Sequence, residues 1–358
     1  MLTSCAMRPV ELSLRLAPRA RYDVIDARAV VRDQHGGALD AYPRGLYCSF
    51  HTTAGFLEQA LCARLGYSRQ YVDPFIGMFQ RVFPEGADYQ HDQIALRTEL
   101  TDEEKRQESR NADSHLAYIS SGLRNCATYV HRGEAPVLFI DLDGVVPAGA
   151  RARRATVLGY HREEAVASWE SALPVSSHSV DSINLRDPKL GFFDELSAAV
   201  RRHDVEHGRI DVTLLPSERN VGLTVNEYET LLMQHDLAEV LRQPVRFMKA
   251  KGRNMLRDPG EIPRKTLDYA KYDLVHLFNE TMDRLRINES ALERMLSRFL
   301  ALPAARFLRM KRSLSLPVST TSGRDGLVYG TYQSPILVQW SKAEDQVRRV
   351  RVSLARFR

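Results

Sequence analysis

Three histidines in the first part of the chain are the residues best suited to carry chemistry. They are His51 in HTTAG, His91 in DYQH and His115 in NADSH. Three imidazoles form a known ligand set for catalytic zinc, with a fourth position left for water or substrate. Alternatively, one histidine acts as a general base while the others hold an anion. The intervals of 40 and 24 residues carry no metal pattern by themselves, so ordinary core or surface histidines are the competing interpretation.

A later stretch of the chain repeats these motifs but lacks the histidines. Aligning Gly55 with Gly222 places His51 opposite Glu218. The motif DYAK at 268–271 then faces DYQH, and NESAL at 288–292 faces NADSH, so a lysine and a leucine stand opposite His91 and His115. This pattern indicates a duplication in which each histidine-bearing motif kept its histidine in one copy only.

The second copy keeps polar residues that the first copy has lost. Asn226 and Glu227 stand where the first copy has Gln59 and Ala60, and GTYQ at 330–333 occurs in the second copy alone. Glu227 is suited to act as a general acid or base, with Asn226 as a fixed amide donor. The competing interpretation is a carboxylate that offsets a helix dipole at the start of a predicted helix, residues 227–245.

Small polar groups flank these residues. Thr52 and Thr53, with backbone N–H groups at an expected helix start, suit an anionic oxygen, although a simple N-cap is an equal interpretation. In GTYQ, Gly330 permits close backbone approach, Tyr332 offers a stacking face, and Gln333 both donates and accepts hydrogen bonds. A plain strand after a β-turn is the alternative for this motif.

The elements that must position these residues follow the same order in both copies. Alternating residues at 11–16 predict a half-buried strand, and residues 182–187 are expected at the same place in the second copy. Amphipathic helices are expected at 22–34 and 192–204, apolar strands at 45–53 and 209–217, and helices at 59–83. Both copies end in a pair of strands. We therefore expect an α+β fold with domains at 8–160 and 181–358, joined by a Ser-rich linker at 161–180.

Composition bounds the class of protein. The 358 residues include 50 Lys and Arg against 45 Asp and Glu, with 44% hydrophobic residues, as in a soluble two-domain protein. The basic residues are dispersed, which gives no support for nucleic-acid binding. No stretch reaches the ~18–20 apolar residues of a membrane span. The four cysteines show no CxxC spacing, so we expect a protein of the reducing cytoplasm.

Two charged segments and one aspartate motif have ordinary explanations. The acidic and basic stretch at 100–110 is expected to be a solvated loop or helix face, and the basic stretch at 246–265 an exposed loop. The strand ending in DLDG at 141–144 resembles the first motif of haloacid-dehalogenase phosphatases, with Asp141 as nucleophile. No later GDxxxD motif follows, so a strand and turn is the expectation.

Taken together, HTTAG, DYQH, NADSH, GLTVNE and GTYQ resemble the YjbQ-like family, often described as secondary thiamine-phosphate synthases. The resemblance covers nearly the whole chain, twice. In the first copy the matching residues are His51, Thr52, Thr53, Ala54, Gly55, Asp88, Tyr89, His91, Asn111, Ala112, Asp113 and His115. In the second copy they are Gly222, Leu223, Thr224, Asn226, Glu227, Gly330, Thr331 and Gln333, with Asp268 and Tyr269 also retained.

The resemblance implies tandem α+β domains on mainly antiparallel sheets, trimeric assembly, and a metal or anion site at the three histidines. Neither copy holds the full set, so we expect one composite site acting on a small anionic, phosphorylated or heterocyclic substrate. Its expected catalytic residues are His51, His91, His115 and Glu227, with the histidines also binding a divalent metal, most simply zinc. Its expected substrate-binding residues are Thr52, Thr53, Asn111, Asp113, Asn226, Gly330, Thr331 and Gln333. Thiamine-phosphate-synthase-like group transfer, metal-dependent hydrolysis and non-catalytic ligand binding or assembly remain alternatives, and three chains would form a pseudo-hexamer.

Overall fold

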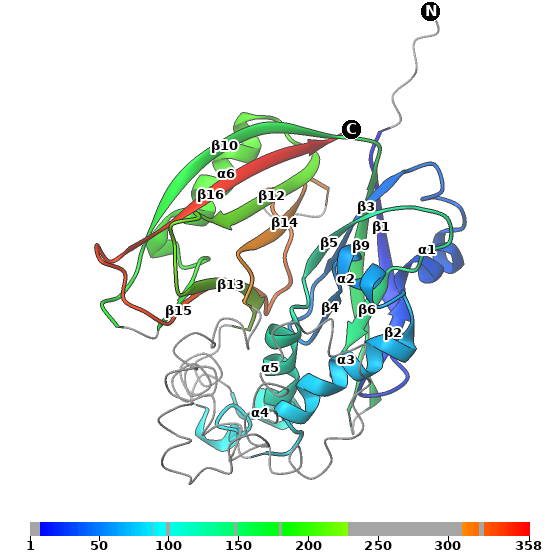
Figure 1. Ribbon diagram of the computed structural model, residues 1–358, viewed down its shortest axis with the longest axis horizontal. Helices are drawn as coiled ribbons and strands as arrows, with labels where there is room; N and C mark the ends of the chain where they lie inside the picture. The colour runs from blue at the N-terminus through cyan, green and yellow to red at the C-terminus, as the bar shows by residue number, and fades with distance from the viewer. Residues whose placement is uncertain are drawn as a thin grey trace, which may run out of the picture.

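A computed structural model describes residues 8–87, 89–97, 101–146, 149–178, 181–227, 310–321 and 326–358. Asp88, most of the predicted helix at 227–245, the basic stretch at 246–265 and the DYAK and NESAL motifs lie outside these residues. Within them the fold is α+β, and the principal sheets are antiparallel, as the sequence predicts. The sheets form two groups (Figure 1).

The first group of sheets belongs to the first copy. Its four-stranded sheet runs in the order β1 (Val10–Leu16), β9 (Arg153–Tyr160), β3 (Arg44–Ser49), β5 (Cys126–Val130). Its three-stranded sheet runs in the order β2 (Asp23–Asp26), β6 (Leu138–Asp141), β4 (Ala54–Phe56). A short ribbon pairs β7 (Val145–Val146) with β8 (Gly149–Ala150).

The second group repeats both strand orders. Its four-stranded sheet runs β10 (Glu163–Pro174), β16 (Val347–Phe357), β12 (His207–Leu214), β14 (Ser313–Ser319). Its three-stranded sheet runs β11 (Asp181–Asn184), β15 (Ser334–Gln339), β13 (Val221–Asn226). Each strand of the two larger sheets of the first copy thus has a counterpart in the second, at the same place in the same kind of sheet.

Two expectations about the start of the second copy are wrong. The segment 161–180 is not a linker, because Glu163–Pro174 form β10 and pair with β16 along their whole length. Residues 182–187 do not correspond to 11–16, because β11 pairs with β15 just as β2 pairs with β6. The counterpart of β1 is β10. An edge strand has only one neighbour, so its polar, solvent-facing composition resembles that of a linker.

Six helices and two 3-10 turns complete the described part of the chain. They are α1 (Ala27–His35), α2 (Gln59–Arg64), α3 (Arg69–Val82), η1 (Ile94–Leu96), α4 (Asp102–Gln107), α5 (Ala112–Ser121), η2 (Pro188–Leu190) and α6 (Phe192–Arg202). Side-chain oxygens of Asp26 and Ser68 accept backbone N–H groups at the starts of α1 and α3. None of the helices in this part of the chain has the length and apolarity needed to cross a bilayer.

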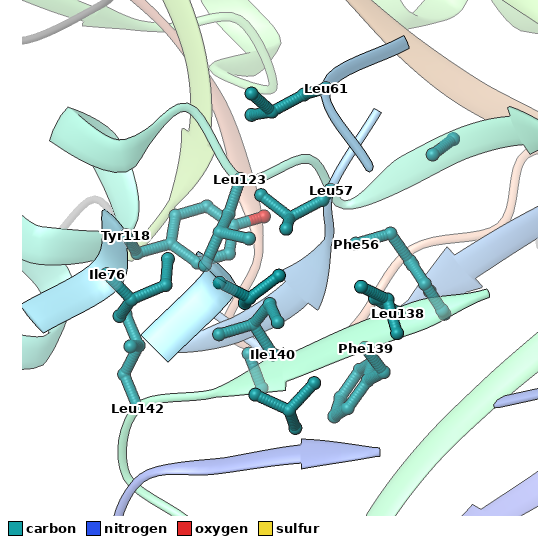
Figure 2. Packing of buried hydrophobic residues seen from close by; sticks show 14 of the residues in the cluster. Phe56, Leu57, Leu61, Ile76, Tyr118, Leu123, Leu138, Phe139, Ile140 and Leu142 are labelled. Atoms are coloured by element: carbon teal, nitrogen blue, oxygen red, sulfur yellow. The ribbon is translucent and has the colours of Figure 1, made fainter. Parts of the chain in front are cut away.

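The core of the first copy forms around its three-stranded sheet. All four residues of β6 are buried, which fits a strand covered on both faces. Phe56 of β4 lies between Tyr47 of the four-stranded sheet and Phe139 of β6, with ring centroids 5.8 and 5.2 Å apart. Figure 2 shows Phe56, Phe139 and Ile140 packed among the leucines around them. A separate apolar core fills the second copy.

Helix α5 is the element that joins the two copies at the candidate site. All ten of its residues are buried, so it has no solvent face. It packs against α3 of its own copy and against β13 of the second copy (Figure 1). Polar residues on such a helix must find partners inside the protein. Its NADSH motif therefore faces the end of β13, where Asn226 stands.

Candidate metal centre

Two histidines of the first copy and one glutamate of the second copy come together at this junction. His91 and His115 are buried, Glu227 is partly exposed, and one ligand atom from each lies within 4.8 Å of the others. His91 precedes η1, His115 is on α5, and Glu227 directly follows β13. Two imidazoles and a carboxylate form one of the known ligand sets of catalytic zinc.

The amide of Asn226 fixes the proton position on His115. Its Nδ2 donates to the Thr52 carbonyl at 3.0 Å, and its Oδ1 accepts the Glu227 backbone N–H at 2.9 Å. These backbone partners allow one orientation of the amide only. His115 Nδ1 lies 2.7 Å from that same Oδ1, so Nδ1 must be the donor. The lone pair of the neutral ring is therefore on Nε2.

Neighbours fix the tautomer of His91 in the same way. His91 Nδ1 lies 3.0 Å from Asp92 Oδ1, which also accepts the Ala112 backbone N–H at 3.1 Å. On the other side of the ring, Arg97 NH1 donates to His91 Nε2 at 3.4 Å. Nδ1 carries the proton and Nε2 the lone pair, as in the carboxylate–histidine pairs that support protein metal ligands.

The space between His115 and Glu227 suits a cation. Burial, followed by the neighbouring His91, holds the pKa of His115 well below its usual range, so the ring is neutral. Its Nε2 lone pair then faces Glu227 Oε2 at 3.4 Å, an acceptor opposite an acceptor. Two ligands of a tetrahedral zinc ion with bonds of about 2.0–2.1 Å lie about 3.3 Å apart. The donor types and this distance both fit zinc.

A buried arginine completes the surroundings of this group. The Arg97 guanidinium lies 3.4 Å from His91 Nε2 and 3.9 Å from Glu227 Oε1. Its NH1 also lies 3.5 Å from Glu108 Oε1, and the side chain is fully enclosed. Asp92 and Arg97 are the two partners that sequence reasoning missed. Asp92 directly follows His91 in the motif, a usable signal, whereas no pattern marks Arg97.

His51 is not a member of this group. Its Nε2 accepts the Arg154 backbone N–H at 2.8 Å, which occupies that lone pair. Glu218, its counterpart in the second copy, accepts the equivalent backbone N–H of Arg349 at 2.9 Å. Burial and the nearby arginines lower the pKa of His51 to about 3, so this ring is neutral as well. The expected set of three histidines is replaced by two histidines and Glu227.

The two copies also place a buried carboxylate at different positions around equivalent arginines. In the first copy Arg153 makes two contacts with Asp141, at 2.7 and 2.8 Å. In the second copy the equivalent Arg348 meets neutral Gln339 at 3.2 Å, while Glu218 lies 3.1 Å away. Each arginine thus keeps one buried carboxylate partner. Asp141 is the last residue of the expected strand, and both of its carboxylate oxygens contact Arg153.

The HTT segment does not begin a helix, contrary to expectation. Residues 51–53 form a bend between β3 and β4, and α2 begins only at Gln59. The Thr52 carbonyl accepts from Asn226, and Thr53 Oγ1 lies 3.3 Å from Arg153 NH2. The chain bends here because β3 pairs with β9 in the four-stranded sheet, whereas β4 pairs with β6 in the three-stranded sheet.

The GTYQ turn holds this bend from the second copy. Gln333 Nε2 donates to the carbonyls of Ser49 and His51, at 2.9 and 2.8 Å, while its Oε1 accepts the Gly330 N–H. A Cβ on Gly330 would lie 2.2 Å from the Phe50 carbonyl oxygen, so only glycine fits. The turn itself, at Thr331 and Tyr332, is exposed.

Asn111 and Asp113 lie in a neighbouring ionic network. Asn111 Nδ2 donates to Asp143 at 2.7 Å, and Arg21 NH2 contacts both carboxylate oxygens of Asp113 at 2.8 Å. Arg151 pairs with Asp143 at 3.0 Å. These contacts connect the start of α5 to the DLDG turn. They position His115, four residues along the chain from Asn111.

Comparisons with known proteins point to small proteins of half this length. No protein-family model and no curated protein matches the sequence. A protein of unknown function from Sulfolobus solfataricus P2, described as YbjQ-like, is 14% identical and has a TM-score of 0.30, over 55% of this chain and 99% of that chain. A hypothetical protein from Aeropyrum pernix K1 is 14% identical over 52% and 96%, with a TM-score of 0.28. An uncharacterised YjbQ/UPF0047-family protein from Clostridium acetobutylicum is 14% identical over 52% and 98%, with a TM-score of 0.26. The chain is similar to YjbQ-like proteins that each span about half of it.

Proposed function

We propose that this protein is a metal-dependent enzyme whose single site lies between the two copies. The observation that carries the proposal is the approach of His91, His115 and Glu227, with both imidazoles turned so that Nε2 is the lone-pair nitrogen. Asn226 and Asp92 hold the opposite nitrogens. Such outer partners orient ligands and raise their basicity. The ligand set would suit zinc, a metal of nitrogen and carboxylate ligands.

The reaction that this set supports best is hydrolysis of a small anionic substrate. His91, His115 and Glu227 would hold the zinc ion, which would supply an activated water and polarise the substrate. Arg97 supplies a buried positive charge beside the ligands, which favours a phosphate or carboxylate group on the substrate. Group transfer, as in thiamine-phosphate synthesis, is the second candidate because five motifs of the chain resemble those of the YjbQ-like family.

The test compares metal content and activity in single substitutions from both copies. We expect His91→Ala, His115→Ala and Glu227→Gln each to lower zinc affinity by a factor of 10 or more, because each removes a ligand. His178→Ala is the control, since its side chain is exposed. Zinc content after dialysis is measured first, followed by hydrolysis of phosphate esters and by thiamine-phosphate synthesis. Full zinc binding and activity in Glu227→Gln would rule out a site shared between the copies.

We further propose that the protein acts in the cytoplasm and assembles as a trimer of two-domain chains. The two copies already meet at one junction, and closed symmetry would unite three chains into six domains. Light scattering on the purified full chain measures the mass. A mass of one chain of 40.7 kDa would exclude the trimer.

A further inference from the structure

We propose that Arg97 blocks the metal centre until a metal ion displaces it, and that the displaced guanidinium then binds the anionic group of the substrate. This inference rests on the proposed metal centre. It adds an anion-binding role for one residue and a coupling between metal and anion.

That lone pair has two mutually exclusive uses. Arg97 NH1 donates to His91 Nε2 at 3.4 Å, while His91 Nδ1–H donates to Asp92 Oδ1 at 3.0 Å. A neutral imidazole has one acceptor nitrogen, and a nitrogen bound to a metal cannot also accept a hydrogen bond. Metal binding at His91 therefore requires Arg97 NH1 to leave.

Charge reinforces this competition. The Arg97 guanidinium also lies 3.9 Å from Glu227 Oε1, so it acts as the positive partner of a carboxylate that a metal would need. A divalent cation at the same carboxylate repels a guanidinium a few ångströms away, and enclosure in the protein makes this repulsion stronger than in water. Arginine and metal thus compete for two of the three ligands.

The contacts of Arg97 also define where it remains after displacement. Glu108 Oε1 lies 3.5 Å from NH1, and Glu108 is not one of the three candidate ligands. A guanidinium kept near Glu108 stays beside the metal, with hydrogen-bond donors turned from His91 toward any new acceptor. A phosphate bound to the metal supplies such oxygens in the geometry that arginine recognises.

The coupling predicts a specific pattern of zinc affinities. The probes are chelator-buffered zinc and inorganic phosphate, with potassium chloride at matched ionic strength as the reference. In the wild-type chain we expect phosphate to raise zinc affinity on the order of tenfold, and zinc to raise phosphate affinity by the same factor. In Arg97→Met we expect zinc to bind about tenfold more tightly without phosphate, and phosphate to have no effect.

Two further variants make the result decisive. Arg106→Met removes an exposed arginine of α4 and should behave as wild type. Arg97→Lys retains the charge and should retain part of the coupling, which also covers the case that Arg97→Met does not fold. Unchanged or weaker zinc binding in a folded Arg97→Met would overturn this inference alone. Failure of the wild-type chain to bind zinc would instead overturn the proposed metal centre.

Discussion

At the scale of single residues, the contacts of His51 differ from those of His91 and His115. His51 and Glu218 accept equivalent backbone N–H groups, from Arg154 and Arg349. Because a glutamate carboxylate takes the place of the imidazole in the second copy, His51 acts at this position as a hydrogen-bond acceptor. The Nε2 atoms of His91 and His115 instead face Arg97 and Glu227. The histidines that look alike in sequence therefore have different roles.

The depressed pKa of His51 predicts a loss of stability in acid. Its pKa is about 3 in the folded protein and about 6.5 when unfolded, so the unfolded chain binds the extra proton between these values. Stability from this group is complete above about pH 6.5 and falls as pH decreases toward 3. We expect His51→Gln, which retains an acceptor for Arg154, to remove about 1–2 kcal/mol of the decline between pH 7.5 and 5. Urea unfolding of both proteins at the two pH values measures it, and parallel declines would contradict it.

At the scale of elements, the buried arginines at the starts of β9 and β16 receive their carboxylate partners from different positions. Both contain a buried arginine, Arg153 or Arg348, that requires a carboxylate. The carboxylate lies at the end of β6 as Asp141 in the first copy. In the second copy it precedes β13 as Glu218, and β15 ends in Gln339. The carboxylate thus comes from the end of the central strand in the first copy and from the segment before β13 in the second. Each arginine has one carboxylate partner in either arrangement.

This exchange predicts that two harmful substitutions compensate one another. Asp141→Gln should cost about 3 kcal/mol, because it leaves the buried Arg153 without its carboxylate. Adding His51→Glu recreates the second-copy arrangement and should recover about 1–2 kcal/mol of that loss. Urea unfolding of wild type, both single variants and the double variant measures the interaction. Simple additivity of the two single effects would show that the arrangements are not interchangeable.

The strand orders explain how far the sequence could predict the fold. The motifs aligned correctly at Gly55 and Gly222, because both glycines lie on fully buried strands, β4 and β13, that pair with the central strand of their three-stranded sheet. The alignment failed at β10, because an edge strand with polar residues on both faces lacks the alternation by which strands are recognised. Arg97 could not be predicted, since its role depends on the contact between copies and no local pattern encodes that contact.

At the scale of the whole molecule, the candidate site is one of the links between two separate apolar cores. His91 and His115 belong to the first copy and Glu227 to the second. The amides of Asn226 and Gln333 of the second copy donate to backbone carbonyls of residues 49–52. A ligand that binds only when both copies are folded stabilises both. Zinc bound here should therefore make the stability of each copy depend on residues of the other.

The two tryptophans of the chain allow this dependence to be measured. Trp169 packs on the core of the second copy, and Trp340 follows β15 and packs on the core of the first copy. The fluorescence of Trp169 therefore reports on the second copy, and that of Trp340 on the contact between the two copies. With free zinc at 100 times its dissociation constant, we expect the wild-type transition in urea to gain about 2.7 kcal/mol. His91→Ala, a change in the other copy, should abolish that gain, whereas His178→Ala should retain it. A tryptophan transition that ignores zinc while the protein binds it would mean that the metal is held by one copy alone.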